Sequence, residues 1–339
     1  MAGGGKAHTT KSLADIFNAF VEDVDTRFTE LKGRFVLWDM NTFDVYGAQY
    51  LDQKRTGLSE QTAYKYLSKQ QVVEEMDEDE KLTSESVENK KRGLHVIYLN
   101  NRVPSREFNR VAKKNEMSLL LTLDHELGHC VLDGAHNATG KLDSGIYAES
   151  IADAFALIRH YQRFGVNSGY HDKYTSPFIR AHNMIFSSDD YHFTAFVLDE
   201  IVKRRHEIDF DKLTLKQTAD LARLFTAEYM PPLKIVQDMY EAFKPVRALA
   251  GRADATAAVK KLVDITLDPA SDYYTVKLGV LWLDHFLKHP KIPDDKTIKI
   301  PADEMKKIGE KVAARARRLE SEKILMNIPL SGKKQRRAP

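Results

Sequence analysis

The chain has 339 residues, of which 42% are hydrophobic and 29% are charged, and its formal net charge is +2 at pH 7. A chain of this length can bury a large core, and the length suggests two or three structural units. The small net charge argues against a general attraction to nucleic acid or membranes, and the single cysteine, Cys130, excludes an internal disulfide framework.

The N-terminal part, residues 1–92, is predicted to be a helical region that ends in an acidic linker. It lacks the apolar segment of a secretory signal, and no run in the chain is long enough to span a bilayer. We therefore expect a cytoplasmic protein, with export by a specialised secretion system left open. Apolar periodicity predicts a helix over 12–32, a short strand over 35–38 and a further helix over 59–75. Residues 74–92 carry an acidic cluster and few large apolar side chains, which predicts a solvated linker.

The chain carries an H-E-x-x-H pattern at His125, Glu126 and His129. On a helix the two histidines lie four residues apart on one face, so both imidazoles can reach one metal ion. Glu126 is the neighbour that can polarise a metal-bound water. The flanking residues are mostly apolar, with a suitable N-cap at Ser118 and a suitable C-terminal glycine at Gly134, as expected for a buried helix.

A second predicted helix follows and carries two acidic residues. Glu149 and Asp153 are four residues apart, hence on one helical face, and the residues around them are mostly apolar. A pair of buried carboxylates is costly unless a cation or hydrogen-bond donors compensate it. A metal held by two histidines also needs a third protein ligand. We therefore predict that Glu149 is the third ligand and that Asp153 orients the ring of one ligating histidine.

This pattern, with Glu149 twenty residues after His129 and Asp four residues further on, resembles the thermolysin-like gluzincin metallopeptidases. The resemblance implies a zincin-like catalytic unit in which His125, His129 and Glu149 hold Zn²⁺ and Glu126 is the general base. It is confined to this short part of the chain, and Ala148 stands where many members of the family carry Asn. The ImmA/IrrE-type peptidases, which pair an H-E-x-G-H helix with a later alanine-rich helix containing Glu, are a second resemblance.

Residues 94–99 form the best predicted strand, directly upstream of the metal-binding segment. In thermolysin-like folds the strand before the zinc helix lies at the edge of the sheet and pairs with an extended substrate. The resemblance therefore implies that Val96, Ile97 and Tyr98 bind substrate by strand addition. An interior strand is the alternative and carries equal weight.

Cleavage of a peptide bond develops negative charge on the carbonyl oxygen, so a hydrogen-bond donor is expected across the site. In the resembled families a His or Tyr downstream of the Glu helix fills this role. We favour His192, which lies in a polar loop before a predicted helix, and Tyr191 is the second choice. Tyr147, His171 and His182 are the remaining candidates.

The rest of the chain is predicted to be almost entirely helical. Helical periodicity covers segments near 191–207, 214–228, 232–248, 253–266, 272–288 and 302–326. We expect an α+β, predominantly helical fold, in which a zincin-like catalytic domain with a small sheet (93–207) precedes an α-helical lobe (208–326) and a basic tail (327–339). The tail leaves nucleic-acid binding open through Lys333, Lys334, Arg336 and Arg337, although no aromatic reader motif accompanies it.

Together these patterns predict a zinc-dependent metalloendopeptidase that acts on protein or peptide substrates. In that mechanism Glu126 takes a proton from the activated water and delivers it to the leaving amine. The alternative is a regulatory or binding protein on a peptidase-like scaffold, or a regulatory peptidase of the ImmA/IrrE type. The presence of Glu126 favours the enzyme over the binding protein. A protein that had lost hydrolytic activity would have no need of a carboxylate beside the metal.

Overall fold

The structure is a computed structural model, and its main organisation is a division into two compact units. It describes residues 12–39, 44–56, 82–87, 94–99, 116–139, 144–168, 177–187, 192–251, 253–290 and 297–325. The first unit comprises residues 1–140, 151–168 and 207–222, and the second comprises 141–150, 169–206 and 223–339. Among the described residues no helix is long and apolar enough to cross a membrane.

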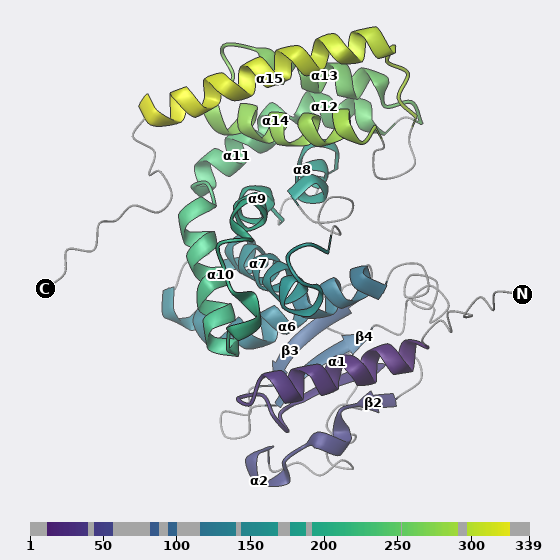
Figure 1. The fold of residues 1–339 in the computed structure, drawn as a ribbon, viewed down its shortest axis with the longest axis vertical. Helices are drawn as coiled ribbons and strands as arrows, with labels where there is room; N and C mark the ends of the chain where they lie inside the picture. Colours follow the sequence, from purple (N-terminus) through teal and green to yellow (C-terminus); the bar gives the residue numbers. More distant parts are fainter. Residues whose placement is uncertain are drawn as a thin grey trace, which may run out of the picture. The chain divides into compact units, whose positions relative to one another are not determined.

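A four-stranded sheet lies in the first unit (Figure 1). Its strands are β1 (Phe35–Asp39), β2 (Asp44–Tyr46), β3 (Leu82–Val87) and β4 (Leu94–Leu99), in the order β2-β1-β4-β3. The central strands β1 and β4 run parallel, whereas β2 and β3 pair antiparallel with their neighbours. Side chains of β1 and β4 build a buried cluster on one face, in which the Trp38 and Tyr98 rings lie 5.7 Å apart. Two short helices, η1 (Ala48–Tyr50) and α2 (Gln53–Thr56), follow β2.

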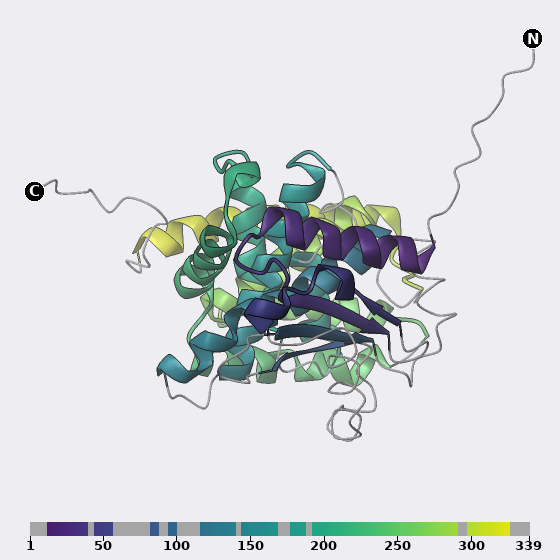
Figure 2. The same ribbon diagram turned by 90° about the horizontal axis from the view of Figure 1, so that it is seen from below.

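Two helices of the first unit pack on the sheet, and a third helix follows them in the chain. Helix α1 (Leu13–Arg27) packs along β1 (Figure 2), α6 (Glu116–Thr139) contacts β3 and β4, and α7 (Ser144–Phe164) follows α6 in the chain. A capping box between Ser12 and Asp15 begins α1, whose apolar side chains are buried. The helix ends five residues before the expected position 32, because Phe28 leaves helical geometry at φ −118° and ψ 82°.

The described residues correct the prediction for the acidic segment 74–92. Residues 82–87 form β3, and all six pair with β4, so this part is an edge strand and not a solvated linker. The expected domain boundary at residue 92 also falls inside one sheet, because β1 and β3 both pair with β4. Residues 74–81 and 88–92 of that segment lie outside the described residues, and so does the helix expected over 59–75.

The second unit is helical. Its elements are α8 (Pro177–Phe186), α9 (Ala195–Arg204), α11 (Leu233–Ala242), α12 (Lys244–Ala250), α13 (Thr256–Leu267), α14 (Tyr273–Lys288) and α15 (Ala302–Leu325). Trp282 is fully buried in its core, stacks on Phe286 at 5.0 Å, and donates its indole N–H to Nδ1 of His182 at 3.3 Å. Helices α13 and α14 approach closely at Gly279, where a Cβ would lie 2.1 Å from Oγ1 of Thr266.

Most of the predicted helices are confirmed, and the differences have local causes. The helix expected over 232–248 is interrupted, because Pro245 lacks the N–H that a continuous helix requires and instead occupies the first turn of α12. The helix that carries the H-E-x-x-H segment begins at Glu116 and continues past Gly134, so neither predicted terminus is correct. Helix α10 (Leu215–Tyr229) and α7 each contribute residues to both units, while η3 (Phe210–Lys212) belongs to the first. The α+β, predominantly helical class is thereby confirmed.

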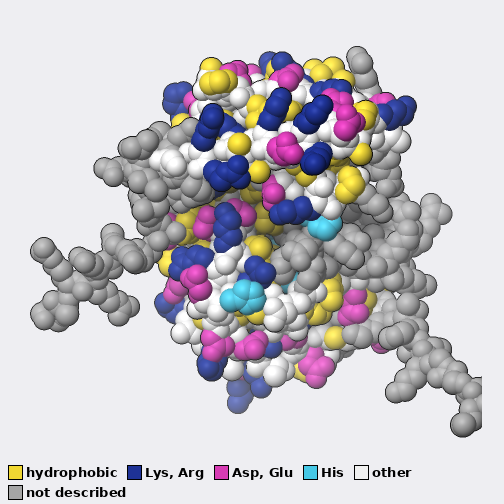
Figure 3. Space-filling view, turned by 45° about the horizontal axis from the view of Figure 1, so that its top comes forward, with side chains coloured by type: hydrophobic (Ala, Val, Ile, Leu, Met, Phe, Trp, Pro, Cys, Tyr) yellow, Lys and Arg dark blue, Asp and Glu magenta, His cyan; other side chains and the backbone are white. Residues whose placement is uncertain are grey.

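Charge on the helical surface is mixed. Figure 3 shows Lys and Arg side chains interleaved with Asp and Glu side chains on the face that it presents, without a continuous basic patch there. Helix α15 itself combines acidic residues in its first turn with the basic residues that follow. The basic tail 327–339 lies outside the described residues.

Candidate metal centre

The two histidines of the H-E-x-x-H segment converge in the first unit. His125 and His129 lie one turn apart on α6, and their Nε2 atoms are 3.1 Å from each other. The rings meet edge to face, with centroids 4.7 Å apart and planes at 81°. Both side chains are half-buried. The four-residue spacing thus places the two ring nitrogens side by side, and their sharing of one metal ion stays a prediction.

Asp153 on α7 holds the His125 ring. Its Oδ1 lies 2.9 Å from Nδ1 of His125, and the two side chains are 8% and 12% exposed. Because a carboxylate can only accept, Nδ1–H is the donor, and this tautomer leaves the lone pair of His125 Nε2 directed away from Asp153. A carboxylate on the distal nitrogen is the arrangement that orients and strengthens a metal-ligating histidine.

The nitrogen pair fits a zinc ion. Zinc–nitrogen bonds of about 2.0–2.1 Å at a tetrahedral angle place two ligand nitrogens about 3.3 Å apart. The 3.1 Å separation between the Nε2 atoms is close to that value. The donor set, two imidazoles with carboxylates nearby in the sequence, also suits zinc. The residues present therefore fit the ion that the sequence predicts.

Gly128 allows the two helices to come this close. A Cβ at this position would lie 3.1 Å from the Ala152 Cα and 3.3 Å from Cδ1 of Phe155, both on α7. Such contacts are tighter than most real Cβ contacts, so an added Cβ would displace its neighbours on α7 by a few tenths of an ångström. The glycine inside the motif therefore favours the close packing of α6 on the helix that carries Asp153.

A buried ionic network lies directly beside the histidines, and the sequence reasoning missed it. Asp124 precedes His125 on α6, and its Oδ1 lies 3.2 Å from Nε of Arg159 on α7, with both side chains 0% exposed. Arg163, one turn further along α7, also pairs with Asp124. Both arginines reach Asp23 of α1, at 2.5 Å and 3.0 Å. The only signal in the sequence was the presence of charged residues at otherwise apolar helical positions.

This network perturbs the ionisation of Asp23. Burial by itself raises the pKa of Asp23, but the charges and hydrogen bonds of Arg159 and Arg163 outweigh that effect, and the pKa falls below the usual range. Asp23 is therefore held as a carboxylate, and it ties α1 to α7 across the first unit.

A second pair of predicted site residues meets within the second unit. Nε2 of His192 lies 3.2 Å from Oε2 of Glu149, and the two side chains are 28% and 24% exposed. His192 lies three residues before α9, and Glu149 lies on α7 one turn before Asp153. The structure thus brings the predicted third ligand and the favoured donor residue into contact with each other.

The other predicted site residues have different outcomes. Val96, Ile97 and Tyr98 are each 0% exposed, and β4 lies between β1 and β3, so the prediction of strand addition to residues 94–99 is wrong and the interior alternative holds. Pairing with the unexpected strand β3 is the reason. Glu126 is half-buried on α6, between the two histidines in the chain.

Among the donor candidates, His182 is excluded by its surroundings. It is 4% exposed in the core of the second unit and accepts the Trp282 indole N–H. Tyr147 is 39% exposed on the first turns of α7. Tyr191 and His171 lie outside the described residues.

The comparisons with known proteins identify no relative. No protein-family model, no curated protein and no solved structure matches the chain.

Proposed function

We propose that the protein is a zinc-dependent metalloendopeptidase of the zincin type. One observation carries the proposal: two histidine Nε2 atoms converge to 3.1 Å, and the distal nitrogen of one of them is held by a carboxylate. The 3.1 Å approach alone also suits a hydrogen bond between the two rings, so the carboxylate on the distal nitrogen is the feature that favours a metal. A carboxylate–histidine–metal arrangement requires both features together.

Glu149 is the third ligand in this proposal. Helix α7 is continuous from Ser144 to Phe164, so Glu149 precedes Asp153 by one turn on the same helical face. The rise of one turn is about 5.4 Å, and Asp153 is itself bonded to His125. In this proposal the long Glu149 side chain would span that rise toward the ion held by the histidines. Three protein ligands then leave a fourth position for water, which is the mark of a catalytic zinc site.

The chain's own residues would carry the proton transfers. Zinc, when bound, supplies a Lewis acid that polarises the scissile carbonyl and lowers the pKa of a water molecule. Glu126 accepts the proton of that water and then donates it to the leaving amine, so one carboxylate acts as base and acid in turn. His192, paired with Glu149 at 3.2 Å, is the proposed donor to the developing oxyanion.

Protein or peptide chains are the proposed substrates, and β3 replaces β4 as the proposed docking strand. In the described part of the sheet β3 is the outer strand, antiparallel to β4, and it contacts α6. An edge strand offers main-chain groups to an extended peptide. Residues 82–87 would therefore align a substrate beside the helix that carries Glu126.

The test combines metal content with turnover. The purified protein should contain about one zinc per chain, and it should cleave peptides in a proteome digest analysed by mass spectrometry. Glu126→Gln should retain zinc but lose about 10²–10⁴-fold in turnover, the usual contribution of general acid–base catalysis. Glu116→Gln, at the start of the same helix, is the matched control and should change neither quantity. Full activity in Glu126→Gln would rule out the proposed base.

A second candidate function is a regulatory or binding protein with a structural zinc. The contact between His192 and Glu149 favours it, because a fourth protein ligand would close the site to water. In that case the protein would hold zinc tightly, and neither wild type nor Glu126→Gln would cleave any peptide.

A further inference from the structure

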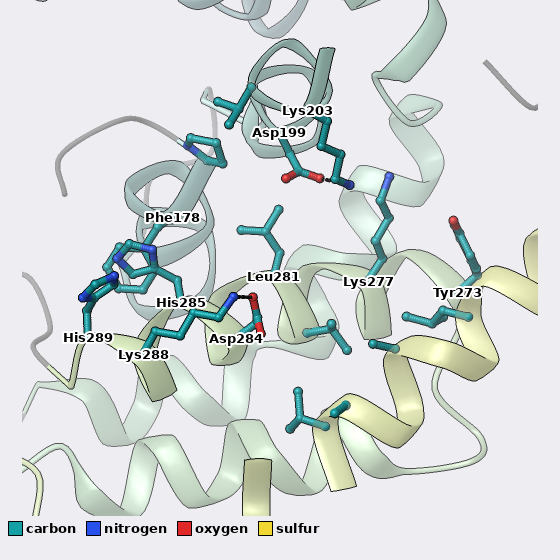
Figure 4. A pocket seen from close by; sticks show the side chains of 17 residues that line it. Phe178, Asp199, Lys203, Tyr273, Lys277, Leu281, Asp284, His285, Lys288 and His289 are labelled. Atoms are coloured by element: carbon teal, nitrogen blue, oxygen red, sulfur yellow. Dashed lines mark hydrogen bonds and ion pairs between the residues drawn. The ribbon is translucent and has the colours of Figure 1, made fainter. Parts of the chain in front are cut away.

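The second unit contains a cavity of about 500 Å³ among α8, α9, α14 and α15 (Figure 4). Its wall combines aliphatic side chains with two ion pairs, Lys203 with Asp199 at 2.6 Å and Lys288 with Asp284 at 2.7 Å. Because these four charges are compensated within the wall, they do not select a class of ligand. A more specific arrangement of reactive groups lies in the first unit.

That arrangement is a serine hydroxyl bonded to a histidine ring at the end of α7. Oγ of Ser168 lies 2.9 Å from Nε2 of His160, and both residues belong to the first unit. A nucleophilic serine and the general base that activates it lie within about 2.6–3.2 Å of each other. Neither residue takes part in the proposed metal chemistry.

The turn after α7 brings the two side chains together. Gly165 follows the last residue of the helix and has a φ of 73°, which glycine adopts without strain. Its N–H donates to the carbonyl of Tyr161 at 2.9 Å, and the N–H of Ser168 donates to the carbonyl of Gly165 at 3.2 Å. The chain therefore folds back, so that Ser168 reaches a ring eight residues earlier in the sequence.

The histidine is shielded from water, whereas the serine is not. His160 is 1% exposed, and its ring centroid lies 5.0 Å from that of Phe164 and 5.9 Å from that of Tyr161. Packing against two aromatic rings restricts the orientation of the imidazole. Ser168 is only half-buried, and a Cβ added at Gly165 of the same turn would meet nothing within 4 Å. A small reagent in solution can therefore approach the serine.

We propose that Ser168 is a nucleophile activated by His160 and that it reacts with small carboxylic esters. In the Nδ1–H tautomer of His160, Nε2 carries a lone pair and accepts the hydroxyl proton. The serine oxygen forms a bond to the acyl carbon, the bond from that carbon to the alcohol oxygen breaks, and the proton passes from Nε2 to the departing alcohol. Water activated by the same nitrogen then releases the acid and restores the serine.

The size of the expected effect limits the substrate class. Proton transfer by one positioned side chain typically contributes about 10²–10⁴-fold to a rate. This suffices for aryl esters, whose alcohol leaves readily. Amides are more stable and require strong stabilisation of the oxyanion in addition. The proposed substrates are therefore aryl esters and not peptides, which distinguishes this site from the proposed metal centre.

The probe is diisopropyl fluorophosphate, used on the full chain. An activated serine displaces its fluoride and forms a stable phosphorus–oxygen bond, which peptide mass spectrometry assigns to one residue. Ser271 is the internal control, because it is also half-buried but its hydroxyl donates to the carbonyl of Ile265 at 2.7 Å and not to a base. Ser168 should be labelled about 10²–10⁴-fold faster than Ser271.

Turnover tests the substrate class. The protein should hydrolyse p-nitrophenyl acetate but not p-nitroacetanilide, which is the amide with the same acyl group. Labelling of Ser168 should abolish this turnover. Both labelling and turnover should be the same with and without a zinc chelator, so the result does not depend on the proposed metalloendopeptidase.

Two variants test the base. Gln in His160→Gln can keep a hydrogen bond to Ser168 but cannot take up a proton at neutral pH, so labelling of Ser168 should fall about 10²–10⁴-fold in a protein that still folds. His206→Gln is the matched control, because it removes an exposed histidine away from this turn, and it should change nothing.

Three outcomes would overturn the proposal. The first is equal labelling of Ser168 and Ser271 in wild type, a comparison that requires no variant. The second is unchanged labelling of Ser168 in a folded His160→Gln protein, which would give the histidine a structural role only. The third is turnover of p-nitrophenyl acetate, in the presence of the chelator, that survives complete labelling of Ser168.

Discussion

Substitution of Gly128 by Ala tests whether the close approach of α6 and α7 builds the metal centre. The added Cβ would meet the Ala152 Cα at 3.1 Å and Cδ1 of Phe155 at 3.3 Å. The first of these atoms belongs to the backbone and cannot rotate away. Helix α7 must therefore shift by a few tenths of an ångström, and Asp153 shifts with it.

The magnitude follows from two opposing terms. Overpacking in a core typically costs about 1–3 kcal/mol, whereas Ala in place of Gly stabilises a helix interior by about 0.5–1 kcal/mol. The net destabilisation is then about 0–2.5 kcal/mol. Gly309→Ala, in the interior of α15, is the matched control, because its Cβ would meet only Cδ1 of Leu287, at an ordinary 3.7 Å. That variant should gain the helix term alone.

Urea unfolding measures the free energies, and competition with a chelator measures zinc affinity. In Gly128→Ala, Asp153 should move away from its 2.9 Å contact with His125. Loss of such a partner of a metal-ligating histidine typically lowers metal affinity about 10–100-fold, so zinc affinity should fall by up to that factor. Gly309→Ala should bind zinc as wild type does. If Gly128→Ala is stabilised as much as the control and keeps its zinc affinity, the helix contact does not position the ligand.

Three further variants separate the proposed roles. Asp153→Asn should lower zinc affinity about 10–100-fold, measured by chelator competition, because an amide no longer fixes the tautomer of His125 as a carboxylate does; unchanged affinity would remove its orienting role. His192→Ala should keep zinc and lose about 2.7–4 kcal/mol of transition-state stabilisation in kcat if it is the oxyanion donor, whereas loss of zinc with it would make it a ligand. For Asp23 the pKa in the folded state lies below the ordinary value for an aspartate, so its stabilisation is present above about pH 4 and is lost as the pH falls through the folded pKa. Asp23→Asn should therefore lose less stability than wild type when urea midpoints are compared between neutral and acid pH, and parallel pH profiles would contradict this account.

The sequence predicted the features that depend on short-range spacing. His125 and His129 converge because four residues make about one helical turn, whatever the rest of the fold does. Strand 94–99 was predicted with its correct bounds, because β-branched and aromatic residues run between turn-forming neighbours. Asp153 was placed near a histidine for a similar reason, since a buried carboxylate needs a donor.

Features that depend on long-range pairing were not predictable in the same way. β3 reads Leu-Thr-Ser-Glu-Ser-Val, a polar sequence within an acidic stretch, and only its six-residue pairing with β4 makes it a strand. Propensity for β structure depends on neighbours in the sheet, which the sequence does not display. Because β3 was missed, β4 was assigned the edge position and Val96, Ile97 and Tyr98 the role of contacting substrate.

The buried ion pair beside His125 constrains the orientation of α6. Asp124 and Arg159 are both 0% exposed, so neither charge can be satisfied by water, and each depends on the rotation of its helix. Removing one partner of such a pair typically costs about 3–5 kcal/mol, because the other charge stays buried without compensation. A rotation of α6 that spoiled the ligand geometry at His125 would also break this pair one residue away. The network therefore makes the orientation of α6 a condition of folding, which is how a rigid scaffold could preorganise the proposed ligands before any ion arrives.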